Sequence, residues 1–330
     1  FDNENAGSDR TVDAVANSVV VGDGTNNNNY AITITPSTAS EITRREITAS
    51  FARQYDGTDT VGNSVLVGFD NLVAGEDLAL SGDGQVVDDS DLSDIDIGTD
   101  KKVLTANLTL IDGVSGDANN YQLASSGHRV TISQRPLTLS VNTVTREYDG
   151  TVDVAGSGAS SGDATHLTST GLVVGDNLAL AELIFDGANA SSGDRVVTIQ
   201  SATLENGSGD DVTANYSLSL VANTTSSITR KDLSLNGARA YDGTDQVASG
   251  VFTLNGVVSG EDLVLSGTAT ASSANVNLSG DGTVLSVALT GSGDLALSDG
   301  LAGLASNYTL GDLTAEAVVI NPAVISLSAQ

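Results

Sequence analysis

The sequence predicts an all-β protein made of tandem β-sandwich-like modules of about 93 residues, which together form an elongated rod. Three features predict this fold. Apolar and polar residues alternate over short stretches, turn-forming residues separate these stretches about every ten positions, and a set of tyrosine motifs recurs at nearly constant spacing. Alternation with a period of two gives a strand one buried face, and no stretch of roughly 11 to 18 residues shows a convincing helical stripe.

The alternation is clearest at 32–34, 137–141, 178–180 and 324–327, which we therefore expect to be strands. Gly-Asp, Asp-Gly and Ser-Gly pairs lie between such stretches, as expected for turns that join antiparallel strands. A short helix within a crossover is compatible with this pattern. The chain therefore reads as many short strands in sandwich-like packing.

The seven tyrosines define the repeat. Tyr-Asp-Gly, each time followed by Thr, begins at Tyr55, Tyr148 and Tyr241, with intervals of 93 residues. Asn-Tyr pairs end at Tyr30, Tyr121, Tyr216 and Tyr308, at intervals of 91, 95 and 92 residues. These two motifs account for every tyrosine in the chain, so the repeat is not a chance pattern.

Other motifs keep the same order. A glycine–acid turn before Leu begins 20, 27 and 19 residues after each Tyr-Asp-Gly tyrosine, at Gly75, Gly175 and Gly260. The variable interval indicates a surface loop, which is lengthened around 157–169. Each Asn-Tyr strand region leads to an isoleucine and then to a junction at 43–45, 133–135, 229–231 or 321–323, and the first three junctions carry basic residues.

These marks divide the chain into modules. We expect an incomplete, C-terminal half module at 1–45, complete modules at 46–135, 136–231 and 232–322, and the first strand of a following module, or a donor strand, at 323–330. Solenoids repeat every 20–50 residues, whereas about ninety residues can bury a core of their own. Because the chain contains no methionine, we expect that Phe1 is not a translational start.

Charge and composition argue against several functions. The 42 acidic and 13 basic residues give a net charge of −29, which disfavours nucleic acid and anionic lipid as partners. No apolar run approaches the roughly 18 residues of a membrane span, so we expect no membrane insertion. There is no cysteine, no phosphate-binding loop and no His-Glu-x-x-His motif. The two histidines, His128 and His166, occupy different repeat positions, and we expect both at the surface. We therefore predict no enzyme, and no catalytic, cofactor-binding or metal-binding residues.

Calcium is the one candidate cofactor that the sequence suggests. A dense acidic run comprises Asp88, Asp89, Asp91, Asp94, Asp96 and Asp100. Hard cations bind six to eight oxygen ligands, which acidic loops can supply. The run lacks the glycine and closing glutamate of an EF-hand and does not recur in the other modules, so a solvated acidic loop is the favoured interpretation.

Two residue classes have competing interpretations. The Tyr-Asp-Gly tyrosines either pack into each module's core, which we favour, or stack on carbohydrate. Eight of the 13 basic residues lie between the junctions and these tyrosines: Arg44, Arg45, Arg53, Arg135, Arg146, Arg230, Lys231 and Arg239. We favour intramolecular pairing with acidic loops where modules meet over binding of an anionic polymer.

Taken in order, Tyr-Asp-Gly-Thr, the glycine–acid turn, Asn-Tyr and the Ile-Thr-x-Arg junction resemble the YDG/MBG-type repeats of large secreted bacterial adhesins of the filamentous-haemagglutinin kind. The resemblance implies an extracellular or cell-surface rod, often exported by a two-partner system, that acts in attachment, aggregation or biofilm cohesion. Its expected partners are other copies or neighbouring repeats, and extracellular polysaccharide or a host or cell-surface ligand.

Two alternatives remain open. In one, 323–330 pairs with the incomplete N-terminal module of the next copy and makes a head-to-tail filament by strand addition. The plain competitor is that both ends belong to a longer chain, which we favour somewhat. In the other alternative, the chain is a carbohydrate-binding module that uses exposed tyrosines or acidic calcium loops.

Overall fold

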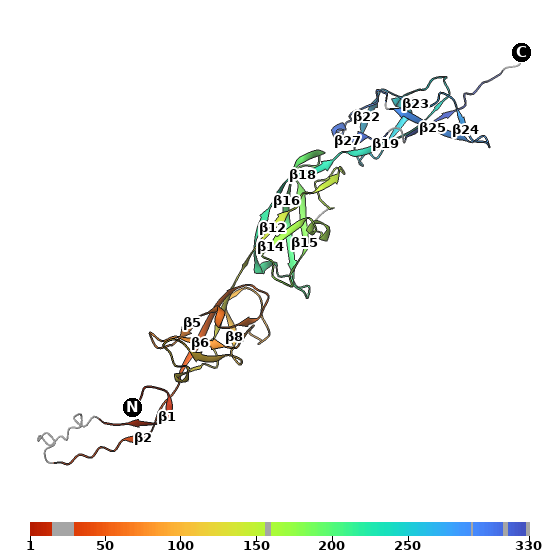
Figure 1. Ribbon diagram of the computed structural model, residues 1–330. Coiled ribbons are helices and arrows are strands. Elements are labelled where there is room, and N and C mark those ends of the chain that lie inside the picture. Colours follow the sequence, from red (N-terminus) through yellow and green to blue (C-terminus); the bar gives the residue numbers. More distant parts are fainter. Residues whose placement is uncertain (15–29, 156–159, 292, 313–315, 328–330) are drawn as a thin grey trace. The chain divides into compact units, whose positions relative to one another are not determined.

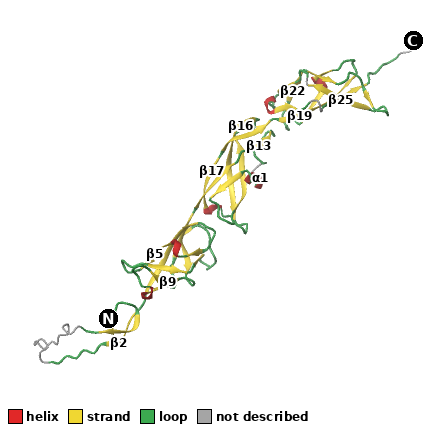
Figure 2. Cartoon of the chain, in the orientation of Figure 1, coloured by secondary structure: helices red, strands yellow, loops and turns green. Residues whose placement is uncertain are grey.

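The computed structural model describes residues 1–14, 30–155, 160–291, 293–312 and 316–327. The protein is mostly strand (52%) with about 6% helix, which confirms the all-β class (Figure 2). Among the described residues, no helix is long and apolar enough to cross a membrane. The chain divides into two compact units: unit 1 comprises 1–137, 171–177 and 205–218, and unit 2 comprises 138–170, 178–204 and 219–330. The division crosses the second predicted module, so the module boundaries stay a prediction.

Unit 1 contains the first eleven strands, labelled in part in Figure 1. They are β1 (Gly7–Val12), β2 (Ser37–Ile42), β3 (Arg45–Gln54), β4 (Thr60–Val61), β5 (Leu66–Asp70), β6 (Leu78–Ser81), β7 (Gly84–Val87), β8 (Gly98–Leu104), β9 (Thr109–Asp112), β10 (Tyr121–Leu123) and β11 (Arg129–Ser133). Seven of them form one sheet in the order β10-β3-β11-β8-β7-β4, with β5 also paired to β3. The pairs β1–β2 and β6–β9 form two-stranded antiparallel sheets.

The next group of strands includes several that run across the division between the units. They are β12 (Arg135–Val141), β13 (Thr145–Glu147), β14 (Leu167–Thr170), β15 (Asn177–Phe185), β16 (Ser191–Glu205), β17 (Tyr216–Val221) and β18 (Asn223–Thr229). They form sheets of order β14-β12-β17 and β13-β18-β16-β15. In β12 the predicted alternation is confirmed, because Leu137, Leu139 and Val141 are buried. A four-residue helix, α1 (Ser161–Ala164), lies in the loop that the sequence marked as lengthened.

The last ten strands all belong to unit 2. They are β19 (Lys231–Ala240), β20 (Gln246–Ala248), β21 (Phe252–Asn255), β22 (Leu263–Ser266), β23 (Thr268–Ala271), β24 (Asn277–Leu278), β25 (Val284–Gly291), β26 (Ala296–Asp299), β27 (Tyr308–Leu310) and β28 (Ala317–Asn321). An eight-stranded sheet has the order β20-β23-β25-β28-β19-β21, with β24 on β25 and β27 on β19. Its core includes Val247, Ala269, Val287, Val318 and Ile320.

Each complete repeat combines antiparallel pairs, which the turn signals led us to expect, with parallel pairs, which they did not. β3 pairs in parallel with β11, β13 with β18, and β19 with β28. In the first and third complete repeats the first strand lies beside the last strand, and in the second repeat the partner of the last strand is β13, the second strand. The paired strands run in the same direction. A parallel pair requires a long crossover, which the rest of the repeat provides.

Two stretches expected to be strands have no strand structure. Residues 30–36 and 322–327 are irregular, and Val324, Ile325 and Leu327 are almost fully exposed. In the complete repeats, the Asn-Tyr strand and the first strand pair with each other, as β10 does with β3. The described residues contain no such partner for either stretch, and alternation alone does not hold an isolated strand in water. Residues 328–330 of the expected terminal strand lie outside the described residues.

His128 is buried, with 1% of its surface exposed, so its expected surface position is wrong. Its Nδ1 accepts a hydrogen bond from the Ala49 amide at 3.0 Å, and its Nε2 lies 2.9 Å from the Ala124 carbonyl oxygen. The imidazole thus joins β3 to the segment that precedes β11. His166 is half-buried.

Candidate functional site: two tyrosine–carboxylate joints

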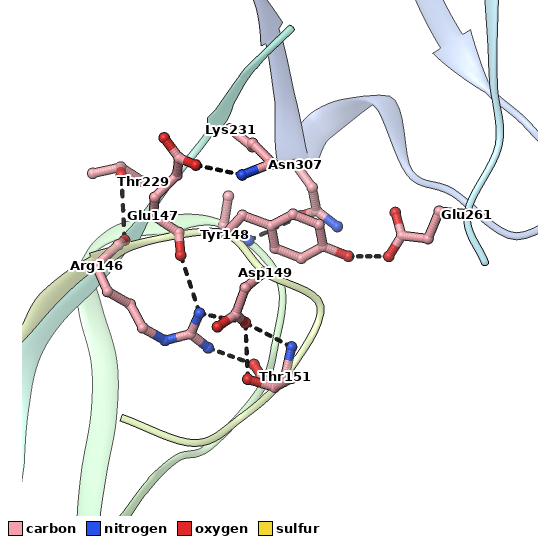
Figure 3. A network of polar contacts seen from close by, with 10 residues as sticks. Arg146, Glu147, Tyr148, Asp149, Thr151, Thr229, Lys231, Glu261 and Asn307 are labelled. Carbon is pink, nitrogen blue, oxygen red and sulfur yellow. Dashed lines mark hydrogen bonds and ion pairs between the residues drawn. The ribbon is translucent and has the colours of Figure 1, made fainter. Parts of the chain in front are cut away.

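Each Tyr-Asp-Gly-Thr motif forms the same rigid turn. In the second copy, the Oδ1 atom of Asp149 accepts hydrogen bonds from the amide and the hydroxyl of Thr151, both at 2.8 Å (Figure 3). The aspartates of the other copies bond their threonines in the same way. The glycine between them has a φ of +82°, which favours glycine. The sequence-based interpretation of Asp-Gly as a tight turn is therefore confirmed.

An arginine two residues before the tyrosine supports this turn from within the same repeat. Arg53, Arg146 and Arg239 each pair with the aspartate of their own turn. Each also donates to the backbone carbonyl of the turn's threonine. These three arginines confirm intramolecular pairing, although their partner is the turn itself. Hydrogen bonds from the Thr244 amide and, with a smaller effect, from the Arg239 side chain lower the pKa of Asp242 to about 2.

The first two turns direct their tyrosines against a tyrosine of the following repeat. Tyr55 and Tyr148 are buried, with 0% and 4% of their surfaces exposed. Tyr55 meets Tyr216 edge-on at 5.3 Å between ring centroids, and Tyr148 meets Tyr308 at the same distance. Edge-to-face pairs contribute about 0.5–1.5 kcal/mol beyond the area they bury. The packing interpretation is confirmed for these two tyrosines, but their rings pack between repeats.

One carboxylate receives both hydroxyl groups of each tyrosine pair. In unit 1, Tyr55 and Tyr216 donate to Asp176 at 3.1 and 2.5 Å. In unit 2, Tyr148 donates to Oε1 of Glu261 (Figure 3), and Tyr308 donates to Oε2 at 2.6 Å. We call these sets the first joint and the second joint. Both carboxylates come from the glycine–acid turns, whose glycines have positive φ.

A buried asparagine fastens the same joints through the backbone. The side-chain oxygen of Asn215 accepts from the Ile97 amide at 3.0 Å, and its nitrogen donates to Asp96 at 2.8 Å. Asn307 makes the same two contacts with Ala190 and Asn189, at 2.9 and 3.0 Å. Each asparagine therefore binds the preceding repeat while the neighbouring tyrosine binds the carboxylate.

The glycine of the turn allows a close approach to the next repeat. A Cβ atom on Gly57 would lie 3.0 Å from Cγ1 of Val173, and one on Gly150 would lie 3.1 Å from Cγ1 of Val258. The same valines donate their amides to the hydroxyl oxygens of Tyr216 and Tyr308. Turn, valine and tyrosine thus form one packed set in each joint.

Burial in the joints raises the pKa of their tyrosines. The pKa values of Tyr55, Tyr148 and Tyr308 rise to about 12, first because the rings are desolvated and then because a carboxylate lies beside each hydroxyl. Tyr216 shifts in the same direction for the same reasons. At neutral pH the phenols are therefore protonated donors, which is the state that a shared carboxylate requires.

The three remaining motif tyrosines, Tyr30, Tyr121 and Tyr241, belong to no complete joint among the described residues, and Tyr30 is exposed. Tyr121 donates to Glu76, and Asn120 binds Ala6 and Asn5, but among the described residues no second tyrosine reaches Glu76. Tyr241, in the third turn, is 42% exposed, so the packing interpretation does not hold for it. The described part of the chain thus contains two complete joints, one in each unit, and each unit also has one half of a joint.

The acidic run of unit 1 has partners of its own. Asp94 and Asp91 pair with Lys101 and Lys102, and Asp88 accepts from the Ser90 and Leu92 amides. Asp96 belongs to the first joint. Among the described residues, no group of three or more histidine, aspartate or glutamate side chains is arranged to hold a metal ion. The solvated loop stays the favoured interpretation of this run, and calcium binding stays the less favoured alternative.

Comparison with protein families gives one match, to residues 133–227, and the matching family is the YDG domain. Residues 133–227 are a YDG domain. Comparisons with curated proteins and with solved structures found no match. The YDG domain contains the turn at Tyr148, the carboxylate of Asp176 and Tyr216. It therefore supplies a tyrosine to the second joint and an acceptor to the first.

Sequence reasoning identified every motif in the joints but not the connections between them. Tyr55 and Asp176 are 121 positions apart, and Tyr148 and Glu261 are 113 apart. The sequence did contain one signal of these long-range contacts. An acid follows the glycine in all three glycine–acid turns, at Glu76, Asp176 and Glu261, and an acid kept at one repeat position in a half-buried turn needs a donor nearby.

Replacing Tyr148 by Phe should weaken the second joint. The variant removes one of the two hydroxyls that donate to Glu261, and losing a hydrogen bond to a partly buried carboxylate costs about 1–3 kcal/mol. We expect the free energy of unfolding to fall by that amount in urea denaturation followed by circular dichroism. Tyr241→Phe is the matched control, because Tyr241 is exposed, and it should change stability by less than about 0.5 kcal/mol. Equal effects of the two variants would contradict the joint.

The joints should also fail at alkaline pH. The folded pKa of Tyr148 and Tyr308 is about 12 and their ordinary value is 10.0, so the unfolded chain releases these protons first. The stabilisation is therefore fully present below pH 10 and is lost as the pH rises through 12. Ultraviolet difference absorbance and circular dichroism on the same samples would follow both events. Ionisation of these tyrosines near pH 10 in the folded chain would disagree with the burial that the structure shows.

Proposed function

We propose that this chain is a structural and adhesive repeat region of a secreted or cell-surface bacterial adhesin or extracellular fibre, acting in attachment, aggregation or the biofilm matrix. The observation that carries the proposal is the recurrence of the same tyrosine–carboxylate joint in both units. Each joint connects consecutive repeats through buried rings, a shared carboxylate and a backbone-binding asparagine. A chain whose repeats are connected in this way can act as a stiff spacer.

The connections between the repeats are too short to act as free linkers. β11 ends at Ser133 and β12 begins at Arg135, while β18 ends at Thr229 and β19 begins at Lys231. One residue thus separates the last strand of a repeat from the first strand of the next. A flexible linker needs many residues without regular structure to let two domains move apart, and each of these junctions has a single such residue.

Side chains fasten the same junctions. Gln134, the single residue between β11 and β12, donates its amide nitrogen to the Ala214 and Tyr216 carbonyls at 3.1 Å. Lys231, at the start of β19, pairs with Glu147 at 2.6 Å (Figure 3). The exposed ion pair contributes little energy, but together with the buried contacts it limits bending.

A second candidate function is head-to-tail assembly by strand addition. The observation that favours it is the terminal segment 322–327, which has no strand partner among the described residues and exposes Val324, Ile325 and Leu327. An extended apolar segment can add to an open sheet edge of another copy. Carbohydrate binding has less support, because five of the seven tyrosines are buried.

Rigidity across the second joint is the first test of the proposed spacer. The chain has no cysteine, so spin labels can be placed uniquely at Leu180→Cys and Val264→Cys, two exposed positions in unit 2 on either side of the joint. We expect a distance distribution as narrow as that of a reference pair within one repeat, at Val264→Cys and Leu285→Cys. Adding Tyr148→Ala should broaden the first distribution only. A broad distribution in the unaltered joint would end the proposal of a stiff spacer.

Deletion of 323–330 tests the second candidate. If this segment joins copies, its removal should abolish concentration-dependent assembly measured by sedimentation velocity. A variant with Val114→Asp and Leu301→Asp removes comparably exposed apolar surface elsewhere and is the matched control. Assembly that survives the deletion, or that the control abolishes equally, would exclude strand addition by this segment.

A further inference from the structure

A cavity lies at the junction between β18 and β19, beside the second joint. It has a volume of about 510 Å³, and all the residues that line it belong to unit 2. Most of them come from the repeat before the joint, and Ser306 comes from the repeat after it. Asn307, the next residue, accepts from the amide of Ala190, which lines the cavity from the earlier repeat, at 2.9 Å. The joint therefore holds the two parts of the lining together.

The lining combines hydroxyl groups with a single positive charge. Six of its nine residues are serine or threonine, and Arg230 is the charged one. No acidic side chain of the described residues lines the cavity, although the chain contains 42 acidic residues. Ile228, which is buried, and Ala190 provide apolar surface. Small-molecule sites typically have volumes of about 300–1,000 Å³, with apolar surface and a few polar groups that fix the orientation of the ligand.

The guanidinium of Arg230 has donors that the described part of the protein does not use. Among the described residues it makes no ion pair and no hydrogen bond. Gln134 holds the same position at the first joint, and its side chain donates to the carbonyls of Ala214 and Tyr216. The corresponding carbonyls of the second joint receive no such bond from Arg230. An arginine presents five donors in a planar fork that matches a carboxylate, so these donors are available to a ligand.

We propose that this cavity binds a carboxylated sugar unit of an anionic polysaccharide. Arg230 would pair with the carboxylate through two parallel hydrogen bonds. Hydroxyls of the lining, such as those of Ser192 and Ser306, would bond to the hydroxyls of the sugar, and Ile228 would contact its ring carbons. The carboxylate of an acidic peptide would use Arg230 but not the hydroxyls around it.

Selectivity in this site would come from local contacts. The net charge of −29 gives the chain no general attraction for anions, so a bound carboxylate must be held by the groups beside it. The site differs from stacking of carbohydrate on tyrosine, because the lining contains no aromatic side chain. The inference rests on the proposed adhesive function and deepens it by naming the class of ligand and where it binds.

The test uses the full chain and three short oligosaccharides, which carry galacturonate, glucuronate or sialate. We expect at least one of them to bind saturably at one site per chain in isothermal titration calorimetry. The same oligosaccharide with its carboxylates reduced to alcohols, and a peptide of three glutamates, should bind at least about tenfold more weakly, because one lacks the charge and the other lacks the hydroxyls. Absence of saturable binding for all three at millimolar concentrations, or equal binding of the peptide, would overturn the proposal.

Two variants of the chain locate the site. Arg230→Gln places at the second junction the residue that the first junction carries, and it should weaken binding at least about tenfold because the charged donors are lost. Ser192→Trp fills the cavity from an exposed position and should weaken binding as much. Lys102→Gln removes one positive charge from unit 1 and is the matched control, which should leave binding unchanged.

Circular dichroism checks the fold of each variant. Binding that survives both cavity variants, or that Lys102→Gln weakens equally, would overturn the proposal. The spin-label distances across the second joint test the spacer separately. Narrow distances without sugar binding would overturn this inference alone, and broad distances with sugar binding would overturn the stiff spacer alone.

Discussion

A carboxylate that is partly removed from water constrains the contact between consecutive repeats. Asp176 and Glu261 lie half-buried, and a charge in such a place is stable only when donors surround it. The chain provides two phenol hydroxyls for each of them, one from the repeat that carries the carboxylate and one from the repeat before it. Because the donors belong to different repeats, satisfying the charge also fixes how one repeat meets the next.

The way each repeat closes explains where the joints lie. The last strand of each complete repeat is a parallel neighbour of the strand that leads into the Tyr-Asp-Gly turn, so the end of the last strand lies beside that turn. Tyr55 and Tyr148 donate their amides to the carbonyls of Ser133 and Thr229, where the chain leaves the repeat. The next repeat begins at this point, which brings its glycine–acid turn over the tyrosine.

The residues that recur in the repeats are used to make turns and joints. Among the described residues, the tyrosine, the asparagine, the arginine and the acid of each complete joint and its turn contact one another or the backbone. The net charge of −29 raises the need for such contacts, because an acidic side chain that is partly removed from water needs a donor beside it.

The sequence by itself determined the all-β class, the period of about 93 residues and the turn at each Tyr-Asp-Gly, because alternation and turn chemistry are local properties of the chain. Only the tertiary structure decided that Tyr148 reaches Glu261, that His128 is buried, and that the alternating residues at 32–34 form no strand. Each of these outcomes depends on a partner far along the chain, or on its absence, and strand direction and register select that partner. Local periodicity carries no information about either.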